Sequence, residues 1–194
     1  KMIKSFKSLT KTELIIWSAS VAVVLVSNII AGTEPITLSA TLVGVTSLIF
    51  IAKGNVVGQF LTVAFSVLYA ITSYRMRYYG EMITYLGMTL PSAVFAAISW
   101  IRHPYKKGEV KISKMTPLKA VVMVLFTSAA TALFYFIMKA LDTPNLAVST
   151  LSITTSFLAS YLTFIRNSYY AVAYAVNDIV LIILWILAAI GDIS

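Results

Sequence analysis

The chain of 194 residues is 59% hydrophobic and only 11% charged, and it carries a net charge of +8 at pH 7. About a quarter of the residues in an ordinary soluble domain are charged, so this composition excludes a water-soluble globular exterior. The cations flank apolar runs, which favours membrane orientation over nucleic-acid binding as the reason for the positive charge. The absence of cysteine excludes disulfides, thiol nucleophiles and cysteine-based metal sites.

Seven apolar segments are each long enough to cross about 30 Å of hydrocarbon as a helix. In chain order, the predicted spans are residues 13–31, 36–52, 56–74, 82–101, 117–140, 145–165 and 169–190. Pro91 lies inside the fourth span, where the loss of one backbone hydrogen bond predicts a kink or a hinge. The long connection before the fifth span is rich in lysine and is expected to be solvated. The pattern predicts an all-α, polytopic membrane protein.

The cations divide unevenly between the two sides of the predicted spans. If the N-terminus is cytoplasmic, 12 of the 15 lysines and arginines lie on the inner side. Those residues are Lys1, Lys4, Lys7, Lys11, Lys53, Arg102, Lys106, Lys107, Lys111, Lys114, Lys119 and Arg166. Cytoplasmic loops of membrane proteins retain lysine and arginine, so we expect the N-terminus inside and Ser194 outside.

Polar and aromatic groups gather on one face of the last predicted span. Asp178 lies near mid-span, where a carboxylate costs about 2.5 to 3.5 kcal/mol, so we expect it to face protein or a water-filled cavity. At 100° per residue, Trp185 nearly eclipses it, while Tyr174 and Asn177 border the same face. We therefore predict that Asn177, Asp178, Tyr174 and Trp185 contact a substrate. The alternatives are a polar clamp between helices for the first pair and an interfacial belt for Trp185.

Two further spans carry polar faces at helical spacing. They are Gln59, Thr62, Ser66, Tyr69 and Ser73 in one, and Ser149, Ser152, Ser156, Ser160 and Thr163 in the other. Small hydroxyl side chains let helices approach closely, so packing explains most of these positions. Gln59 and Tyr69 are predicted substrate contacts, because a larger polar group inside a membrane needs a partner that a ligand can supply. Ser66, on the same face, is predicted as a contact with them.

Signatures of enzymes are lacking. His103 is the single histidine and lies in the basic connection, where a solvated side chain is expected. No histidine or carboxylate cluster has metal-ligand spacing, and no phosphate-binding glycine loop or serine nucleophile with a base is present. We expect neither a catalytic activity nor a cofactor.

A weak internal repeat relates two inner turns. The stretch from Phe50 to Asn55 resembles the stretch from Phe164 to Asn167, and a span with an aromatic residue follows each. Two three-helix units joined by one helix have the same orientation, which is a parallel repeat. The expected domains are an N-terminal lead with an extra helix, a first repeat, a basic loop with a linking helix, and an incomplete second repeat: residues 1–35, 36–101, 102–144 and 145–194. The second repeat is one span short, and we expect the native protein to continue beyond Ser194.

Several short motifs resemble the PnuC family of bacterial vitamin transporters. They are Asn177-Asp178 running into Leu184-Trp185, the Tyr79-Gly80-Glu81 step, and Pro91 with the later Ser99-Trp100. The similarity covers roughly residues 38–192. It implies a three-plus-one-plus-three core related to the SWEET sugar transporters, with an extra helix in front and the last helix of the second repeat missing.

The resemblance also implies a function. It implies facilitated uptake of nicotinamide riboside across the bacterial inner membrane, sustained by phosphorylation of the substrate in the cytoplasm and without a coupling ion, and assembly as a homotrimer. It further implies that Asn177, Tyr174 and Trp185 help line the cavity. Thiamine or another vitamin as substrate, proton coupling through Asp178, and a membrane scaffold without transport are the alternatives that the residues leave open.

Overall fold

The structure, a computed structural model, describes residues 5–6, 8–76, 79–105, 108–143 and 145–191, without the side chains of Tyr79, Trp185, Ala188 and Ala189. The chain forms two compact units, unit 1 (Lys1–Lys111) and unit 2 (Ile112–Ser194). Within the described ranges the regular structure is helical, and the β contacts are two isolated bridges, Asn55 with Glu109 and Pro104 with Val110. The expected all-α fold is confirmed.

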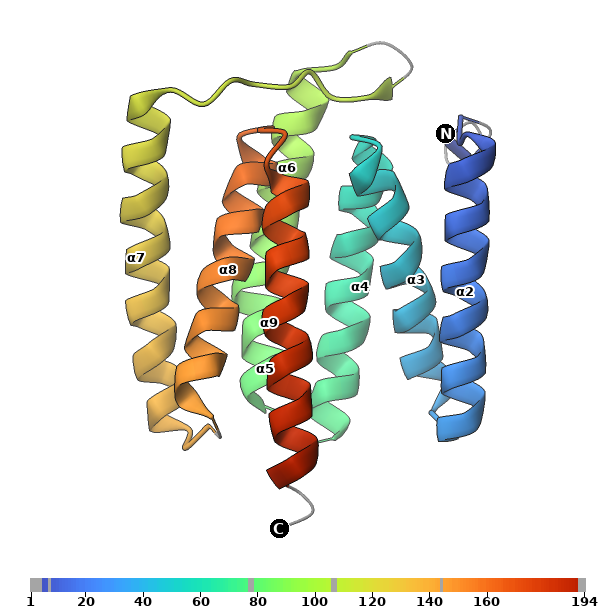
Figure 1. The fold of residues 1–194 in the computed structure, drawn as a ribbon, viewed down its shortest axis with the longest axis vertical. Coiled ribbons are helices and arrows are strands. Elements are labelled where there is room, and N and C mark those ends of the chain that lie inside the picture. The colour runs from blue at the N-terminus through green and yellow to red at the C-terminus, as the bar shows by residue number, and fades with distance from the viewer. Residues whose placement is uncertain (1–4, 7, 77–78, 106–107, 144, 192–194) are drawn as a thin grey trace. The chain divides into compact units, whose positions relative to one another are not determined.

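Unit 1 contains four long helical segments that run up and down (Figure 1). They are α2 (Lys11–Ala31), α3 (Pro35–Ala52), α4 (Val56–Arg75), and a composite of α5 (Tyr79–Thr84), η1 (Tyr85–Thr89) and α6 (Leu90–Arg102). A capping box begins α2, because the Thr10 hydroxyl accepts from the Glu13 N–H at 3.2 Å and the Glu13 carboxylate accepts from the Thr10 N–H at 2.7 Å. The first four predicted spans agree with these bounds to within a few residues.

The composite segment changes its hydrogen-bonding pattern just before Pro91. The Leu90 N–H donates to the Tyr85 carbonyl, five residues back, so η1 is a π-helix. A π-helical turn adds one residue to the helical ladder, and it precedes the point where proline removes a donor. The π-helical turn was not predicted from the sequence, and the kink or hinge expected at Pro91 stays a prediction.

A glycine sets how closely α3 and α4 pack. A Cβ atom built on Gly58 would lie 2.6 Å from the Ile51 amide nitrogen and 2.9 Å from the Ser47 carbonyl oxygen. Both are backbone atoms of α3, so only a residue without a side chain allows this approach. Close backbone packing of this kind replaces the hydrophobic driving force that membrane helices lack.

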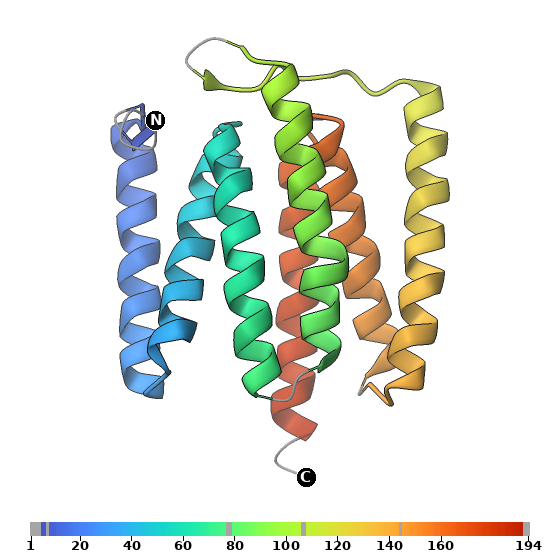
Figure 2. The same ribbon diagram turned by 180° about the vertical axis from the view of Figure 1, so that it is seen from behind.

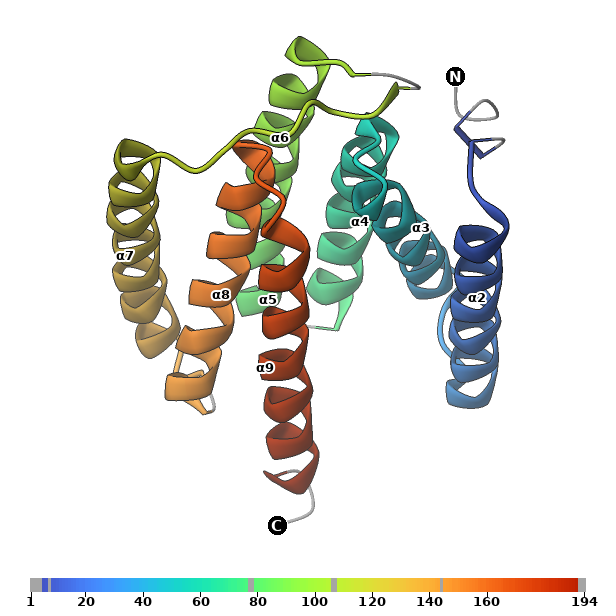
Figure 3. The same ribbon diagram turned by 45° about the horizontal axis from the view of Figure 1, so that its top comes forward.

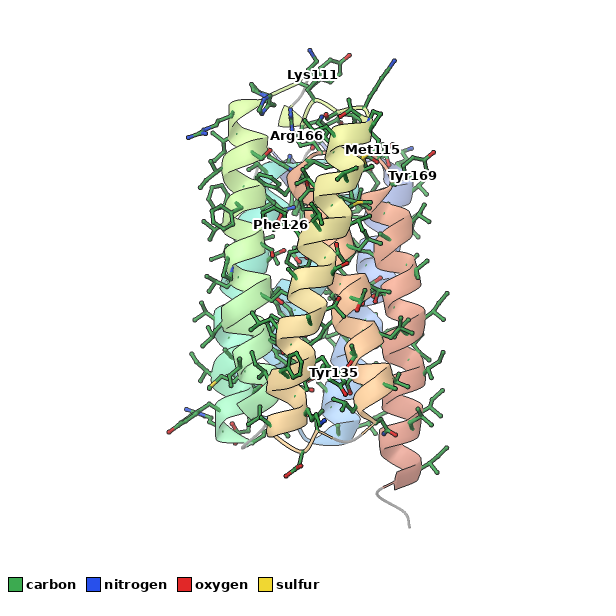
Figure 4. The ribbon with its side chains drawn as sticks, turned by 90° about the vertical axis from the view of Figure 1, so that its left-hand side faces the viewer. Lys111, Met115, Phe126, Tyr135, Arg166 and Tyr169 are labelled. Carbon is green, nitrogen blue, oxygen red and sulfur yellow. The ribbon has the colours of Figure 1, made fainter. Side chains whose placement is uncertain are left out.

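Unit 2 contains three helices, α7 (Pro117–Ala140), α8 (Leu146–Phe164) and α9 (Tyr170–Gly191). The hydroxyls of Thr131 on α7 and Thr154 on α8 are hydrogen-bonded at 2.9 Å. Figure 4 shows Arg166, in the turn between α8 and α9, at the end of the unit where α7 begins, and Tyr135 nearer the other end of α7. The remaining three predicted spans agree with these helices within one or two residues.

The two turns that suggested a repeat share their local geometry. Gly54 and Arg166 both adopt left-handed φ angles, 70° and 60°, and each precedes an asparagine. The Asn55 and Asn167 side chains each accept the N–H two residues later, at 3.0 and 3.1 Å, and so begin the next helix. The carbonyl of the residue before each asparagine accepts an N–H from the connection between α6 and α7. The Val110 N–H donates to the Gly54 carbonyl at 2.8 Å, and the Ser113 N–H donates to the Arg166 carbonyl at 2.9 Å. These contacts support the repeat, while the full three-plus-one-plus-three arrangement stays a prediction.

The surfaces of the helices are apolar, as a lipid environment requires. Among the described residues, six helical segments are long and apolar enough to cross a bilayer, and α9 has a shorter apolar stretch over Tyr170–Leu184. Ile30 on α2 is 82% exposed and Leu118 on α7 is 74% exposed. Exposed aliphatic side chains along whole helices are unfavourable in water and favourable in hydrocarbon, so the chain is a multi-pass membrane protein.

Candidate substrate site

Asn177 lies on the face of α9 that packs against α8, and the two helices lie side by side in Figures 1 and 3. Its side chain is only 5% exposed. The amide oxygen accepts from the hydroxyls of Thr155 at 2.7 Å and Ser156 at 2.8 Å. The Ser156 hydroxyl has no other acceptor among the described residues, so its proton is directed to the Asn177 oxygen. This bond holds the amide oxygen of Asn177 toward α8. The amide nitrogen keeps both N–H groups without a partner among those residues, so it can donate to a ligand.

Tyr174 lies one turn before Asn177 on α9 and is half-buried. Its side chain lies close to the hydroxyls of Ser160 and Thr163 on α8. The α8 hydroxyls that the sequence assigned to packing therefore position two predicted substrate contacts. This seam between α8 and α9 is polar over two turns, although both helices are apolar overall.

Asp178 is exposed, whereas Asn177 beside it is buried. The expectation that Asp178 faces protein or a water-filled cavity stays a prediction. The two residues differ in exposure because consecutive residues on a helix differ by 100°, and α8 covers α9 on the side of Asn177. A mid-helix carboxylate is too costly to face lipid, so this flank of α9 requires protein or water in the membrane. The side chain of Trp185, the fourth predicted contact on α9, lies outside the described residues.

Gln59 on α4 is 2% exposed, and its side-chain nitrogen is buried without a hydrogen-bond partner. An unpaired buried amide donor costs about 1 to 3 kcal/mol, so this group needs an explanation. Ser66, two turns further along, is also fully buried, but its hydroxyl donates to the Thr62 carbonyl at 2.8 Å. Ser66 is therefore satisfied within its own helix, and Gln59 is the predicted contact with a free donor.

Tyr69 lies in an aromatic cluster rather than alone. Its ring centroid is 4.3 Å from that of Tyr85 on η1 and 5.5 Å from that of Phe65 on α4, and Phe65 and Tyr85 meet edge to face at 5.6 Å. Its side chain lies close to the carboxylate of Glu81 on α5. Sequence spacing indicated Tyr69 but not Tyr85 and Glu81, because these two residues lie on a different helical segment.

The contacts predicted on α4 do not form one tight group. Gln59 and Tyr69 are ten residues apart, which is about 15 Å along a helix axis. Ser66 lies between them. The candidate residues of unit 1 therefore lie at different heights along α4. This distribution fits contacts along a substrate pathway better than contacts in one compact pocket. Thr155 and Ser156 position the Asn177 amide; spacing had assigned Ser156 to packing and had not included Thr155.

No metal centre is evident in the part of the chain that the structure describes. Across those residues, no three histidine, cysteine, aspartate or glutamate side chains gather closely enough to hold an ion. The two ion pairs there, Lys53 with Glu13 at 2.7 Å and Arg75 with Glu34 at 3.2 Å, lie at helix ends. The candidate residues on α4 and α9 can therefore contact a substrate through hydrogen bonds, aromatic rings and the carboxylate of Asp178.

Comparisons with known proteins agree with this arrangement. The fold is similar to a solved structure described as the crystal structure of the vitamin B3 transporter PnuC, with a TM-score of 0.81 and 19% sequence identity over 98% of this chain and 83% of that chain. No curated protein sequence matches the chain. The sequence model of the nicotinamide mononucleotide transporter family matches residues 34–191, which is most of the chain. The chain therefore belongs to the nicotinamide mononucleotide transporter family, the PnuC family of membrane transporters.

Proposed function

We propose that this protein carries nicotinamide riboside across the bacterial inner membrane by facilitated diffusion. Phosphorylation of the substrate in the cytoplasm would keep its free concentration low there and sustain inward flux. Family membership supports a transporter of this vitamin class, and the similar solved structure is described as a vitamin B3 transporter. The uneven distribution of cations supports a cytoplasmic N-terminus.

Asn177 is the observation that carries the proposal. A buried amide whose oxygen is fixed by two hydroxyls and whose N–H groups remain unpaired is prepared to donate to a substrate. Nicotinamide riboside offers matching acceptors in its carboxamide oxygen and its ribose hydroxyls. Because the amide is already oriented, binding costs little additional side-chain entropy.

The other predicted contacts complement the remaining parts of such a substrate. The carboxylate of Asp178 is suited to a ring with a fixed positive charge, and the rings of Tyr174, Trp185 and Tyr69 are suited to stacking on it. Gln59 supplies a second free amide donor. Ser66, which is satisfied by its own helix, is the weakest of the proposed contacts.

Calorimetric titration of the purified protein tests the proposal directly. Nicotinamide riboside, thiamine and riboflavin are each titrated, and we expect specific binding of the first. Asn177→Ala is expected to weaken that binding by at least about tenfold, since a hydrogen bond to a buried amide is lost. Asn28→Ala is the matched control, because the Asn28 amide is already paired with Val24 and Thr33. Wild-type affinity in Asn177→Ala would remove the assignment.

Proton coupling through Asp178 is the second candidate, favoured by an exposed carboxylate on a transmembrane helix that has no ion-pair partner among the described residues. Liposomes with an imposed pH gradient separate the two mechanisms. A facilitated carrier equilibrates its substrate and does not concentrate it when a gradient is present. Accumulation that follows the gradient and disappears in Asp178→Asn would establish coupling instead.

A further inference from the structure

Three cations of unit 2 converge on Ser113, in the segment that leads into α7. The Ser113 N–H donates to the Arg166 carbonyl at 2.9 Å, and the Asn167 side-chain amide donates to the Ser113 carbonyl at 3.2 Å. These bonds hold the segment against the turn between α8 and α9. The Lys119 ammonium, from the first turn of α7, donates to the Ser113 hydroxyl at 2.5 Å and to the Lys114 carbonyl at 3.3 Å. Lys114 and Lys119 therefore lie at the end of unit 2 where Figure 4 shows Arg166.

The sequence of unit 2 supplies no acid at this end of the unit to balance the cations. Asp142 follows the opposite end of α7, Asp178 lies near the middle of α9, and Asp192 comes after the last residue of α9. Glu109, the nearest acid in the sequence, belongs to unit 1, where its backbone pairs with Asn55. Neither of the two ion pairs among the described residues involves a cation of unit 2. Like charges held near each other repel, so this end of the unit favours an anion.

An exposed apolar face of α7 begins at the same end. Leu118, Val121 and Leu125 are 74%, 56% and 63% exposed, and their spacing of three and four residues places them on one side of the helix. Figures 1 and 2 show α8 between α7 and α9, so α7 has a flank that the other helices of unit 2 leave open. In a membrane this face contacts acyl chains. A lipid whose chains cover it has its headgroup at the level of the cations.

We propose that Lys114, Lys119 and Arg166 bind the phosphate of an anionic phospholipid whose acyl chains lie along the exposed face of α7. The general retention of cations on the inner side explains their sign, whereas their convergence on one serine indicates a specific lipid. A headgroup with a net negative charge suits these cations, while the cation of a zwitterionic headgroup offsets the attraction of its phosphate. Such a lipid contacts both α7 and the turn before α9, and so joins α7 to the helix that carries Asn177. The proposal does not depend on which substrate is carried.

Equilibrium binding of radiolabelled lipids to the purified full chain, immobilised in detergent micelles, tests the site. Dioleoylphosphatidylglycerol is the anionic probe, and dioleoylphosphatidylcholine, with the same acyl chains, is the zwitterionic one. We expect the wild type to bind the anionic lipid at least about tenfold more tightly than the zwitterionic lipid. Lys114→Gln and Lys119→Gln are each expected to weaken binding of the anionic lipid about fivefold, because each removes one positive charge from the site. Binding of the zwitterionic lipid is expected to change by less than about twofold.

Lys139→Gln is the matched control, because Lys139 is exposed in the last turn of α7 and its loss changes the net charge equally. We expect Lys139→Gln and the charge-preserving Lys119→Arg to bind the anionic lipid within about twofold of wild type.

Four results would each overturn the site: equal wild-type affinity for the two lipids, wild-type affinity in Lys114→Gln, a loss in Lys139→Gln equal to that in Lys114→Gln, or a loss in Lys119→Arg equal to that in Lys119→Gln. Circular dichroism verifies that each variant folds. If Lys119→Gln does not fold, Lys114→Gln decides alone, since the Lys114 side chain is exposed. Excess inorganic phosphate is expected to displace no more lipid than sodium chloride of the same ionic strength; greater displacement would indicate a site for free phosphate and overturn the lipid assignment.

Discussion

The contact between α3 and α4 gives the sharpest test of how this membrane fold is held together. Gly58→Ala adds a single methyl group, whose carbon would lie 2.6 Å from the Ile51 nitrogen and 2.9 Å from the Ser47 oxygen. Carbon atoms in comfortable contact are about 3.5 to 4.0 Å from their neighbours, so the helices must separate by about 1 Å. The opposing atoms belong to the backbone, and no side-chain rotation relieves the clash.

The expected change in the free energy of unfolding of Gly58→Ala is the balance of two opposing effects. Alanine is favoured over glycine in a helix by about 0.5 to 1 kcal/mol, which opposes the loss. Overpacking typically costs about 1 to 3 kcal/mol, and a gap of 0.5 to 1 Å forfeits a quarter to a half of each dispersion contact along the interface. We expect a net destabilisation of about 1 to 2 kcal/mol.

The assay is reversible unfolding of the purified protein in mixed micelles with increasing sodium dodecyl sulfate, followed by circular dichroism. Gly87→Ala is the matched control, because a Cβ atom built there meets nothing within 4 Å. It is expected to be neutral or slightly stabilising. If Gly58→Ala unfolds at the same detergent fraction as Gly87→Ala, the close approach of α3 and α4 does not hold the unit together and the packing argument fails.

Two further predictions concern a turn and the site. Gly54→Ala places a methyl group on a residue with φ 70°, where L-residues are strained. We expect it to lower the free energy of unfolding by about 1 to 2 kcal/mol in the same assay. A stability equal to that of Gly87→Ala contradicts this reasoning. Ser156→Ala removes one of the two hydroxyls that fix Asn177, and we expect nicotinamide riboside to bind about fivefold more weakly by calorimetry while the unfolding transition scarcely moves. Unchanged affinity would show that Ser156 does not position the amide.

Part of the arrangement at the candidate site follows from helical spacing, while the roles of its residues stay predictions. Helical spacing placed Tyr174 and Asn177 on the same face, and the structure pairs both with hydroxyls of α8. The cost of an amide in hydrocarbon is a local property, so Asn177 could be singled out without a fold. Gln59 was identified by the same reasoning, and its unpaired buried nitrogen supports that interpretation.

Other features needed the fold. Asp178 is exposed while Asn177 beside it is buried, because which flank of α9 is covered depends on where α8 packs. Tyr85 and Glu81 lie near Tyr69 although they belong to a different helical segment, which no spacing within one helix could predict. Spacing rules assume 3.6 residues per turn, so they fail where the ladder gains a residue.

The sequence by itself determined the membrane environment, the number and bounds of the helices and the turns between them. These depend on the length of apolar runs and on local groups such as Thr10 and Asn55, which act within a few residues. Only the tertiary structure decided that Gly58 joins α3 to α4, that Ser156 orients Asn177 and that Glu81 lies against an aromatic cluster. These contacts join residues on different helices, and packing across helices depends on the shapes of both surfaces at once.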